Sequence, residues 1–579
     1  MRFPSIATLV EHALAVLRRF PWTLAAGAVA AGAAIVASAG GTHEDATRLT
    51  FVAALGLPLT IALTLLAEVR GWPVVRKQIV LLAGALGLAA FYLVWLGIEV
   101  THEAIRYAQL SAALHLSVAF LPFLGAAESL AFWQYNRRLF LGFLRAIVFS
   151  AVLFVGIAIA LGALDKLFGV HIPGETYFRM WTVIAFVVNT WIFLALVPVD
   201  LPALAGDTEY PRALKIFAQY ILTPLAFTYL VLLLAYLLKI VAGAEWPSGW
   251  IGWLVASVSV TGLLGFLLVH PLRSDPSEGW IRTYARWLFV GLIPAALMLL
   301  VAFWKRIVPY GLTEPRVMGL VLGVWLLGIA CLFTARASSS IRTIPVSLSV
   351  LLLLTLYGPA SLTRISITSQ GRGLARMLES KDSAGPREAS AALRFLIDHR
   401  AGKEIAARLG RPLPPIDWTS LRRYGGSRDS LGTRLMALRG ATYLAAWEER
   451  RGGWFQLNSN DPLAVAGFDW VLPVTSGDPA PRMVGGDSVN VAFQRETGLV
   501  RLRVGGDTLD FDLRRLGRHA GTSMQPMGKV PGESLRVEAT AGGRRAVLSL
   551  NQLHGNRKGD SVTVNYWGGW VLLGKVPQQ

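Results

Sequence analysis

Long apolar runs separated by short polar loops fill the chain from residue 22 to residue 362. The clearest two lie between Glu245 and Arg316, where the loops are rich in Trp, Tyr, Pro, Arg and Glu, as is typical of helices anchored at the surfaces of a bilayer. Most runs approach or exceed the ~20 residues that cross about 30 Å of hydrocarbon. Because backbone groups in lipid must be satisfied within their own segment, we predict that all of them are helices. The eleven runs are Trp22–Ala39, Leu49–Ala67, Ile79–Val100, Ala108–Gly125, Leu139–Leu164, Phe178–Val197, Ile216–Val241, Trp250–His270, Tyr284–Trp304, Val317–Thr334 and Ile344–Leu362.

Different patterns precede and follow these runs. Residues 1–21 place apolar side chains on one helical face and end in basic residues, which predicts an amphipathic helix lying in the membrane interface. Residues 363–426 carry Leu and Ile at helical spacing among charges and then a Pro-rich stretch, which predicts an amphipathic helical connector and a linker. In residues 427–579 alternating residues flank Gly505-Gly506-Asp507, which predicts a β-hairpin within a β-rich extramembrane domain.

Composition agrees with this division. The 579 residues are 54% hydrophobic and only 16% charged, whereas about a quarter of the residues of a soluble protein are charged. We therefore predict an all-α polytopic membrane helix bundle of about eleven spans in residues 22–362, followed by the smaller connector and the β-rich domain. The single cysteine, Cys331, excludes an intramolecular disulfide and a Cys-rich metal site.

The basic residues between the runs predict an orientation. If the N-terminus is cytoplasmic, sixteen Lys and Arg residues lie on the cytoplasmic side and eight on the opposite side. The positive-inside rule therefore favours a cytoplasmic N-terminus. Eleven spans then place the C-terminal domain outside the cytoplasm, and a miscount by one span reverses this conclusion.

An excess of positive charge predicts the partners. From Leu362 onward the chain has 31 Lys and Arg residues against 20 Asp and Glu residues. A basic domain held beside a bilayer is drawn to anionic headgroups, so membrane lipids are the expected partners. Nucleic acid is not expected, because the chain has no zinc-finger spacing and no aromatic-basic RNA motif.

Polar residues within or beside the runs are the candidates for function, because ionisable groups in a membrane are costly. His115 and Asn189 lie within runs, and the carboxylates of Asp200 and Glu314 stand beside prolines at the ends of runs, with Arg316 close by. Such residues can line a pathway through the membrane. The alternatives are hydrogen bonds between packed helices and solvation at the interface.

The loops hold a second group of polar candidates and no catalytic motif. We find no Walker A, H-E-x-x-H, G-x-S-x-G or dinucleotide-binding pattern, so no catalytic residue and no cofactor is predicted. His43, His102 and His171 lie near carboxylates in three loops, and such clusters can bind zinc. The sequence holds no evidence that these residues lie together in space, and no metal site is predicted. The polar loop candidates are Glu128, Asn136, Arg137, Arg138 and His270.

Several motifs together resemble a known family. They are Phe132–Arg138 (FWQYNRR), Leu164–Gly169, Glu245–Trp250, His270–Arg273, Trp280–Trp287 and Tyr310–Arg316 (YGLTEPR). This combination resembles the bacterial multipass membrane family catalogued as domain of unknown function 4153, over roughly residues 120–378. The resemblance implies a location in the bacterial cytoplasmic (inner) membrane. It brings no established activity and no catalytic residues.

Two classes of function follow from these features. In the first, the helices form a pathway for a small solute or ion, or a groove for a lipid, and the number of spans favours such a transporter. In the second, the helices anchor a sensor or envelope scaffold whose basic β-rich domain binds an anionic partner. A membrane enzyme is third, since no constellation of His and carboxylate residues stands out.

Overall fold

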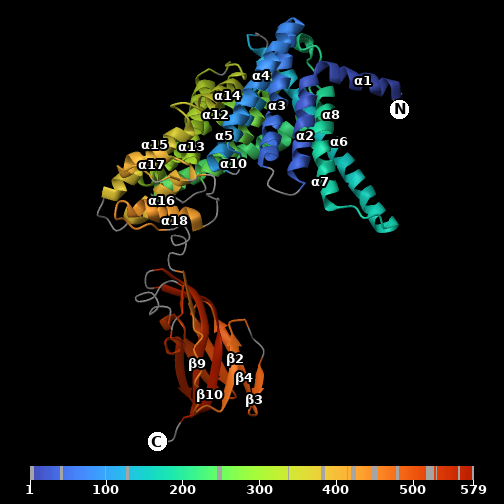
Figure 1. The fold of residues 1–579 in the computed structure, drawn as a ribbon. Helices are drawn as coiled ribbons and strands as arrows, with labels where there is room; N and C mark the ends of the chain where they lie inside the picture. Colours follow the sequence, from blue (N-terminus) through green and yellow to red (C-terminus); the bar gives the residue numbers. More distant parts are fainter. Residues whose placement is uncertain are drawn as a thin grey trace. The chain divides into compact units, whose positions relative to one another are not determined.

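A computed structural model of the protein contains two compact units, Met1–Ala441 and Thr442–Gln579. It describes residues 6–39, 44–97, 100–125, 129–243, 251–336, 338–379, 385–413, 415–416, 418, 426–444, 454–477, 481–516, 527–529, 531–558 and 561–576. The first unit is helical and the second is built from β-strands (Figure 1). This is the predicted division into a membrane helix bundle and a β-rich region.

Every predicted apolar run contains a helix. In the described part of the chain, nine helical segments are long and apolar enough to cross a membrane. A tenth is counted if α1 and α2, which meet at a bend of 97°, form one broken span. The helices of this region are α1 (Ile6–Arg19), α2 (Pro21–Ala37), α3 (Glu44–Val69), α4 (Val74–Val94), α5 (Thr101–Phe120), α6 (Ser129–Phe168), α7 (Gly174–Val183), α8 (Asn189–Ala195), α9 (Arg212–Ile216), α10 (Thr223–Gly243), α11 (Ile251–Val269), α12 (Trp280–Tyr310), α13 (Glu314–Ala335) and α14 (Thr343–Leu354).

Short irregular helices join several of these elements. Two π-helical turns, η2 (Ile184–Val188) and η4 (Phe217–Leu222), connect α7 to α8 and α9 to α10, so each pair forms one continuous span. The 3₁₀ turns lie outside the spans or at their ends. They are η1 (Leu121–Phe123), η3 (Pro202–Gly206), η5 (His270–Ser274) and η6 (Pro276–Glu278).

The difference from eleven predicted spans lies in α2 and α14. α14 has 12 residues because its apolar run is interrupted by a Gly-Pro pair that begins at Gly358, whose φ is +84°. It nevertheless runs antiparallel along α5. The Ser349 hydroxyl donates to the carbonyl of Ala113 (3.1 Å), and the Gln109 amide donates to the Thr355 hydroxyl (3.0 Å). The sequence therefore located the segment but overestimated its helical length.

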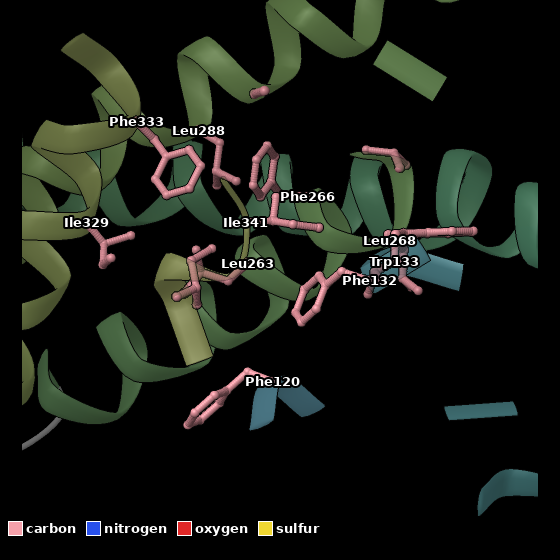
Figure 2. Packing of buried hydrophobic residues seen from close by; sticks show 14 of the residues in the cluster. Phe120, Phe132, Trp133, Leu263, Phe266, Leu268, Leu288, Ile329, Phe333 and Ile341 are labelled. Atoms are coloured by element: carbon pink, nitrogen blue, oxygen red, sulfur yellow. The ribbon is translucent and has the colours of Figure 1, made fainter. Parts of the chain in front are cut away.

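Aromatic side chains of α11, α12 and α13 form the centre of the bundle. Phe289 stacks on Phe333 (4.8 Å between ring centroids), and Phe266 meets both rings edge-on. Figure 2 shows Phe266 and Phe333 in this core, with Leu288 and Ile329 nearby. Without a hydrophobic driving force between helices in lipid, such close packing is what holds the helices together.

Four helices follow the bundle within the same unit and gather beside α13 (Figure 1). They are α15 (Leu362–Glu379), α16 (Gly385–Asp398), α17 (Gly402–Leu409) and α18 (Gly426–Ala437). The first three form the predicted connector, and their apolar face is buried at Leu374, Leu393, Leu396, Ile405 and Leu409. All of α18 after Gly426 falls within residues 427–579, where β structure was predicted. It folds as a helix because Leu431, Leu435 and Met436 are buried on one of its faces.

The second unit has two sheets around one core. A sheet with the order β2-β10-β9-β1-β7, in which β8 also pairs with β9, faces a meander of β3, β4, β5 and β6. The predicted hairpin is formed by β5 and β6, which pair Val504 with Asp507. The strands are β1 (Trp454–Asn458), β2 (Trp470–Thr475), β3 (Arg482–Val484), β4 (Asp487–Gln494), β5 (Leu499–Val504), β6 (Asp507–Asp512), β7 (Met527–Lys529), β8 (Arg536–Ala541), β9 (Arg544–Lys558) and β10 (Ser561–Lys575).

Candidate functional site

The loop between α12 and α13 is fixed by the first connector helix. It holds the motif Tyr310–Arg316. Gln370 of α15 donates its amide to the carbonyls of Tyr310 (3.1 Å) and Leu312 (2.9 Å), and the Leu312 N–H donates to the Ser369 hydroxyl (3.0 Å). Gly311 takes a φ of +68°, which only glycine adopts without strain. The motif thus docks α15 against the ends of two spans.

Glu314, the first residue of α13, forms a buried pair with a histidine far along the chain. His399, just beyond α16, brings Nε2 to 2.7 Å from Glu314 Oε1, and the two side chains are 5% and 4% exposed. His399 Nδ1 lies 2.7 Å from the carbonyl of Phe395, which can only accept a hydrogen bond. Nδ1 therefore carries a proton, and a second proton lies between Nε2 and the carboxylate. The pair is a buried site for one shared proton.

Three residues at the start of α5 extend this pair into a cluster. The ring of His102 stacks on that of His399 (4.7 Å between centroids, 21° between planes). The carboxylate of Glu103 lies 3.4 Å from His102 Nε2 and accepts a hydrogen bond from Arg106. His102 Nδ1 and Glu103 Oε2 are buried without a hydrogen-bond partner in the described residues. We call His102, Glu103, Arg106, Glu314 and His399 the histidine–glutamate cluster.

The histidine–glutamate cluster joins three elements through side chains that are mostly buried. It ties α5, α13 and the end of α16 together. Its two carboxylates are each paired, Glu103 with Arg106 and Glu314 with His399. Among the residues that the structure describes, no group of three or more His, Cys, Asp or Glu side chains is placed to hold a metal ion. The arrangement can hold a proton and lock the connector onto the bundle. Removing one member leaves a buried charge unpaired, which is strongly destabilising.

An open cavity of about 680 Å³ is lined by Leu312 of the Tyr310–Arg316 loop and by residues of α15. Three of its arginines are Arg364, Arg372 and Arg376, which fall on one face of α15 because they are spaced by multiples of four residues. Arg408 of α17 adds a fourth guanidinium. We call this space the arginine cavity.

The charge of the arginine cavity is largely uncompensated. Arg408 pairs with Glu404 (2.8 Å), whereas Arg364, Arg372 and Arg376 have no acidic partner within the described ranges. Like charges at this spacing repel one another on a helix. Thr368 and Ser369 add hydroxyls to the lining, and Leu312 and Ile365 add apolar surface. The cavity is suited to an anion with an apolar part.

Two of the predicted loop arginines meet at one carboxylate. Asp207 Oδ2 lies 3.2 Å from Arg137 and 2.8 Å from Arg138, while Asn136 donates to main-chain carbonyls of α5 and of its own helix. Burial raises the pKa of Asp207, but hydrogen bonds from Arg138 and a backbone N–H and the charge of Arg137 outweigh it and hold the pKa below its usual value. The Phe132–Arg138 motif therefore connects α6 to α5 and to the loop that carries Asp207.

The remaining predicted residues are dispersed. His115 is exposed and bonds within α5, Asn189 accepts a hydrogen bond from the Ser150 hydroxyl of α6 (3.3 Å), and Asp200 is exposed and caps a turn. His270 packs edge-on against Phe266 (5.7 Å). Arg316 donates to the carbonyls of Tyr310 and Gly311 and steadies that loop. Glu128, His43 and the Glu245–Trp250 motif lie outside the described residues.

Of the predicted pathway residues, only Glu314 and Arg316 lie at the candidate site. The sequence analysis missed His399 and the three arginines of α15. A signal for the arginines was present, since their spacing of four and eight residues marks one helical face. No local signal connects His399 to Glu314, because 85 residues separate them.

Comparisons with known proteins show which part of the chain belongs to a family. The family model described as Domain of unknown function (DUF4153) matches residues 24–380, which end one residue beyond α15. The uncharacterized protein PM1469 of Pasteurella multocida (strain Pm70) is 24% identical over 177 residues, which are 31% of this chain and 30% of that protein. This chain thus spans less than a third of that relative's length in the match. No solved structure matches. The arginine cavity, apart from Arg408, lies within the family region, whereas His399 lies beyond it.

Proposed function

The chain belongs to the family described as Domain of unknown function (DUF4153), and we propose that it is a multipass membrane protein that binds phosphate-bearing lipid headgroups in the arginine cavity. The observation that carries this proposal is the row of three unpaired arginines on one face of α15. Guanidinium groups bind phosphate oxygens in pairs, and such charge-assisted hydrogen bonds are roughly twice as strong as neutral ones.

The position of the arginine cavity favours a lipid over a soluble anion. Leu312, in its lining, lies between the end of one span and the start of the next, which is the level of the headgroups. Pro359 and Ile365 give the cavity an apolar wall, against which the glycerol and upper acyl carbons of a lipid can pack. A soluble phosphate would leave this wall unused.

The histidine–glutamate cluster supports the same role. It lies under the connector that carries the arginines and holds the end of α16 on α5 and α13. A binding site gains affinity when its elements are held in place before the ligand arrives. We infer that the cluster keeps the connector docked.

The basic β-rich domain is less suited to bind an anionic partner. Several of its arginines are already paired across its strands. Arg501 binds Asp510 (2.8 Å), Arg544 binds Asp487 (2.7 Å) and Arg545 binds Glu538 (3.0 Å). We therefore assign the headgroup contact to the helical unit, and a scaffold role of the β-rich domain remains the second proposal.

A transport function is supported only by the number of predicted spans. A shared pathway predicts that His115, Asn189 and Asp200 line one cavity. Neither the arginine cavity nor the other large cavity of the helical unit is lined by any of them. Headgroup binding accounts for more of the described geometry.

The proposed location is the bacterial cytoplasmic membrane, with the N-terminus in the cytoplasm. The antiparallel course of α14 along α5 supports an eleventh crossing, despite its 12 residues. With eleven crossings, the arginine cavity and the β-rich domain are extracytoplasmic.

Titration of the purified protein in detergent with phosphatidylglycerol, followed by native mass spectrometry, tests headgroup binding. The variant R364Q/R372Q/R376Q should bind this lipid at least about ten-fold more weakly, because each lost charge-assisted contact is worth about 1.5–3 kcal/mol. The matched control K403Q/R411Q/R434Q removes three exposed charges outside the cavity, two from the connector and one from α18, and should bind like the wild type. Equal affinities of all three proteins, or equally effective competition by inorganic phosphate, would contradict the proposal.

A further inference from the structure

A second open cavity, of about 960 Å³, lies at the opposite end of α12 from the arginine cavity. It runs between the α9–η4–α10 span and the start of α12, and we call it the lateral groove. Its rim is at the start of both spans, and its wall continues along their apolar surfaces. The lateral groove is therefore polar at its rim and apolar along its wall, as a lipid is polar at its headgroup and apolar along its acyl chains.

The rim of the lateral groove carries one net positive charge. Lys215 Nζ lies 2.6 Å from Glu278, which also accepts from the Trp280 indole (2.8 Å) and the Gln219 amide (3.0 Å). Arg212, one turn before Lys215, is exposed and has no acidic partner among the described residues. A phosphodiester carries one negative charge and matches this unpaired guanidinium.

The wall of the lateral groove is aromatic. Tyr220, Phe227 and Trp287 line it and are 73%, 46% and 59% exposed. Fifteen residues separate Arg212 from Phe227, which is about 22 Å along a helix at 1.5 Å per residue. This length accommodates a headgroup and the upper part of an acyl chain.

A buried hydroxyl in the lining lacks a partner. Thr182 and Thr334 donate their hydroxyls to the carbonyls four residues earlier, as is common in spans. Thr223 follows the π-helical turn η4, which alters that register, and its Oγ1 is buried without a hydrogen bond in the part of the chain that the structure describes. Thr223 Oγ1 and Tyr284 Oη both face the space left by Gly265, where an added Cβ would lie 3.8 Å and 3.0 Å from them. A ligand oxygen can satisfy the Thr223 hydroxyl.

We propose that the lateral groove is a second, independent binding site, for a glycerophospholipid. Its phosphodiester binds Arg212, an ester oxygen accepts the hydrogen bond of the Thr223 hydroxyl, and an acyl chain lies along Phe227 and Trp287. This site faces the membrane surface opposite to that of the arginine cavity, so α12 links two lipid sites, one in each leaflet.

The test uses the full chain in detergent, with native mass spectrometry and phosphatidylglycerol as the probe. All proteins carry R364Q/R372Q/R376Q, so that the arginine cavity does not contribute and failure of one proposal is distinguishable from failure of the other. Adding R212Q/T223V should weaken binding about ten-fold or more. The control R282Q/T334V loses the same two groups outside the groove and should bind like its parent.

Two further arms identify the ligand. A diacylglycerol with the same chains lacks the phosphodiester and should bind weakly to every variant, and inorganic phosphate should not displace the phospholipid. If R212Q/T223V does not fold, R212Q alone serves, because this side chain is exposed and its loss leaves the packing intact. Unchanged affinity of the groove variant, or displacement by inorganic phosphate, overturns the proposal.

Discussion

Replacing His399 by leucine should release the connector from the bundle. The imidazole and the carboxylate of Glu314 are 5% and 4% exposed and lie 2.7 Å apart. Removing one partner of such a buried pair costs about 3–5 kcal/mol, since the other charge stays buried without compensation. A tenfold change in an equilibrium corresponds to about 1.4 kcal/mol. The population with α16 undocked should therefore rise by roughly two to four orders of magnitude.

Two matched variants distinguish two causes of destabilisation, a buried charge left without a partner and the loss of packing. Glu314→Gln should cost about 1 kcal/mol or less, because a neutral imidazole can donate Nδ1–H to Phe395 and accept from the new amide at Nε2. The double variant H399L/E314L should be less destabilised than H399L, because replacing both members of a buried pair by apolar groups removes the unpaired charge.

Hydrogen–deuterium exchange of residues 385–398, measured by mass spectrometry, reports the docking of α16 directly. We expect much faster exchange in H399L, near-wild-type exchange in E314Q and partial recovery in H399L/E314L. Equal exchange in H399L and E314Q would refute the reasoning. So would a double variant that exchanges faster than H399L, because the destabilisation would then come from packing and not from charge.

Three other predictions test separate parts of the protein. Gly371→Ala should destabilise the connector by about 1–3 kcal/mol in thermal unfolding, because the new Cβ would lie 2.7 Å from Cγ of Glu404, whose carboxylate is paired with Arg408. Asp207→Asn should lower the melting temperature at neutral pH and have little effect in acid. The folded-state pKa of Asp207 is depressed because hydrogen bonds from Arg138 and the backbone outweigh burial, so its contribution is present above the ordinary Asp value and is lost as the pH falls through the depressed one. Cysteine at Ser476, in a chain without the natural cysteine, should react with an impermeant maleimide on intact cells. Reaction only after lysis would place the β-rich domain in the cytoplasm.

The type of each element, helix or strand, could be predicted from the sequence because it depends on interactions between residues close together in the chain. An apolar run in lipid has to be helical, because only a helix pairs its backbone groups within one segment, and each predicted run does contain a helix. Alternation around Gly505 predicted the β5–β6 hairpin, because one face of each strand is buried, at Val500, Leu502 and Phe511 among others. These features depend on neighbours within a few residues.

The ends of helices were harder to predict from the sequence where single glycine or proline residues interrupt the hydrophobic pattern. The run predicted at Ile344–Leu362 continues past a Gly-Pro pair, which ends α14 at Leu354. The start of the β-rich unit at Thr442 follows a helix whose sequence, with glycines at 426 and 432, has little helical character of its own. Burial of its leucines against the connector decided the outcome.

Tertiary structure alone decided which polar residues belong together. Glu314 was a candidate because it stands at the end of a span. Its place in the histidine–glutamate cluster, however, depends on the contact with His399, which is 85 residues away. Arg137 and Arg138 were equally prominent in the sequence, yet both are bound by the carboxylate of Asp207. The arginines of α15 lack such a carboxylate among the described residues, and for that reason we propose their cavity as the binding site. A sequence records the charges of side chains, whereas their compensation depends on distances that only the folded chain fixes.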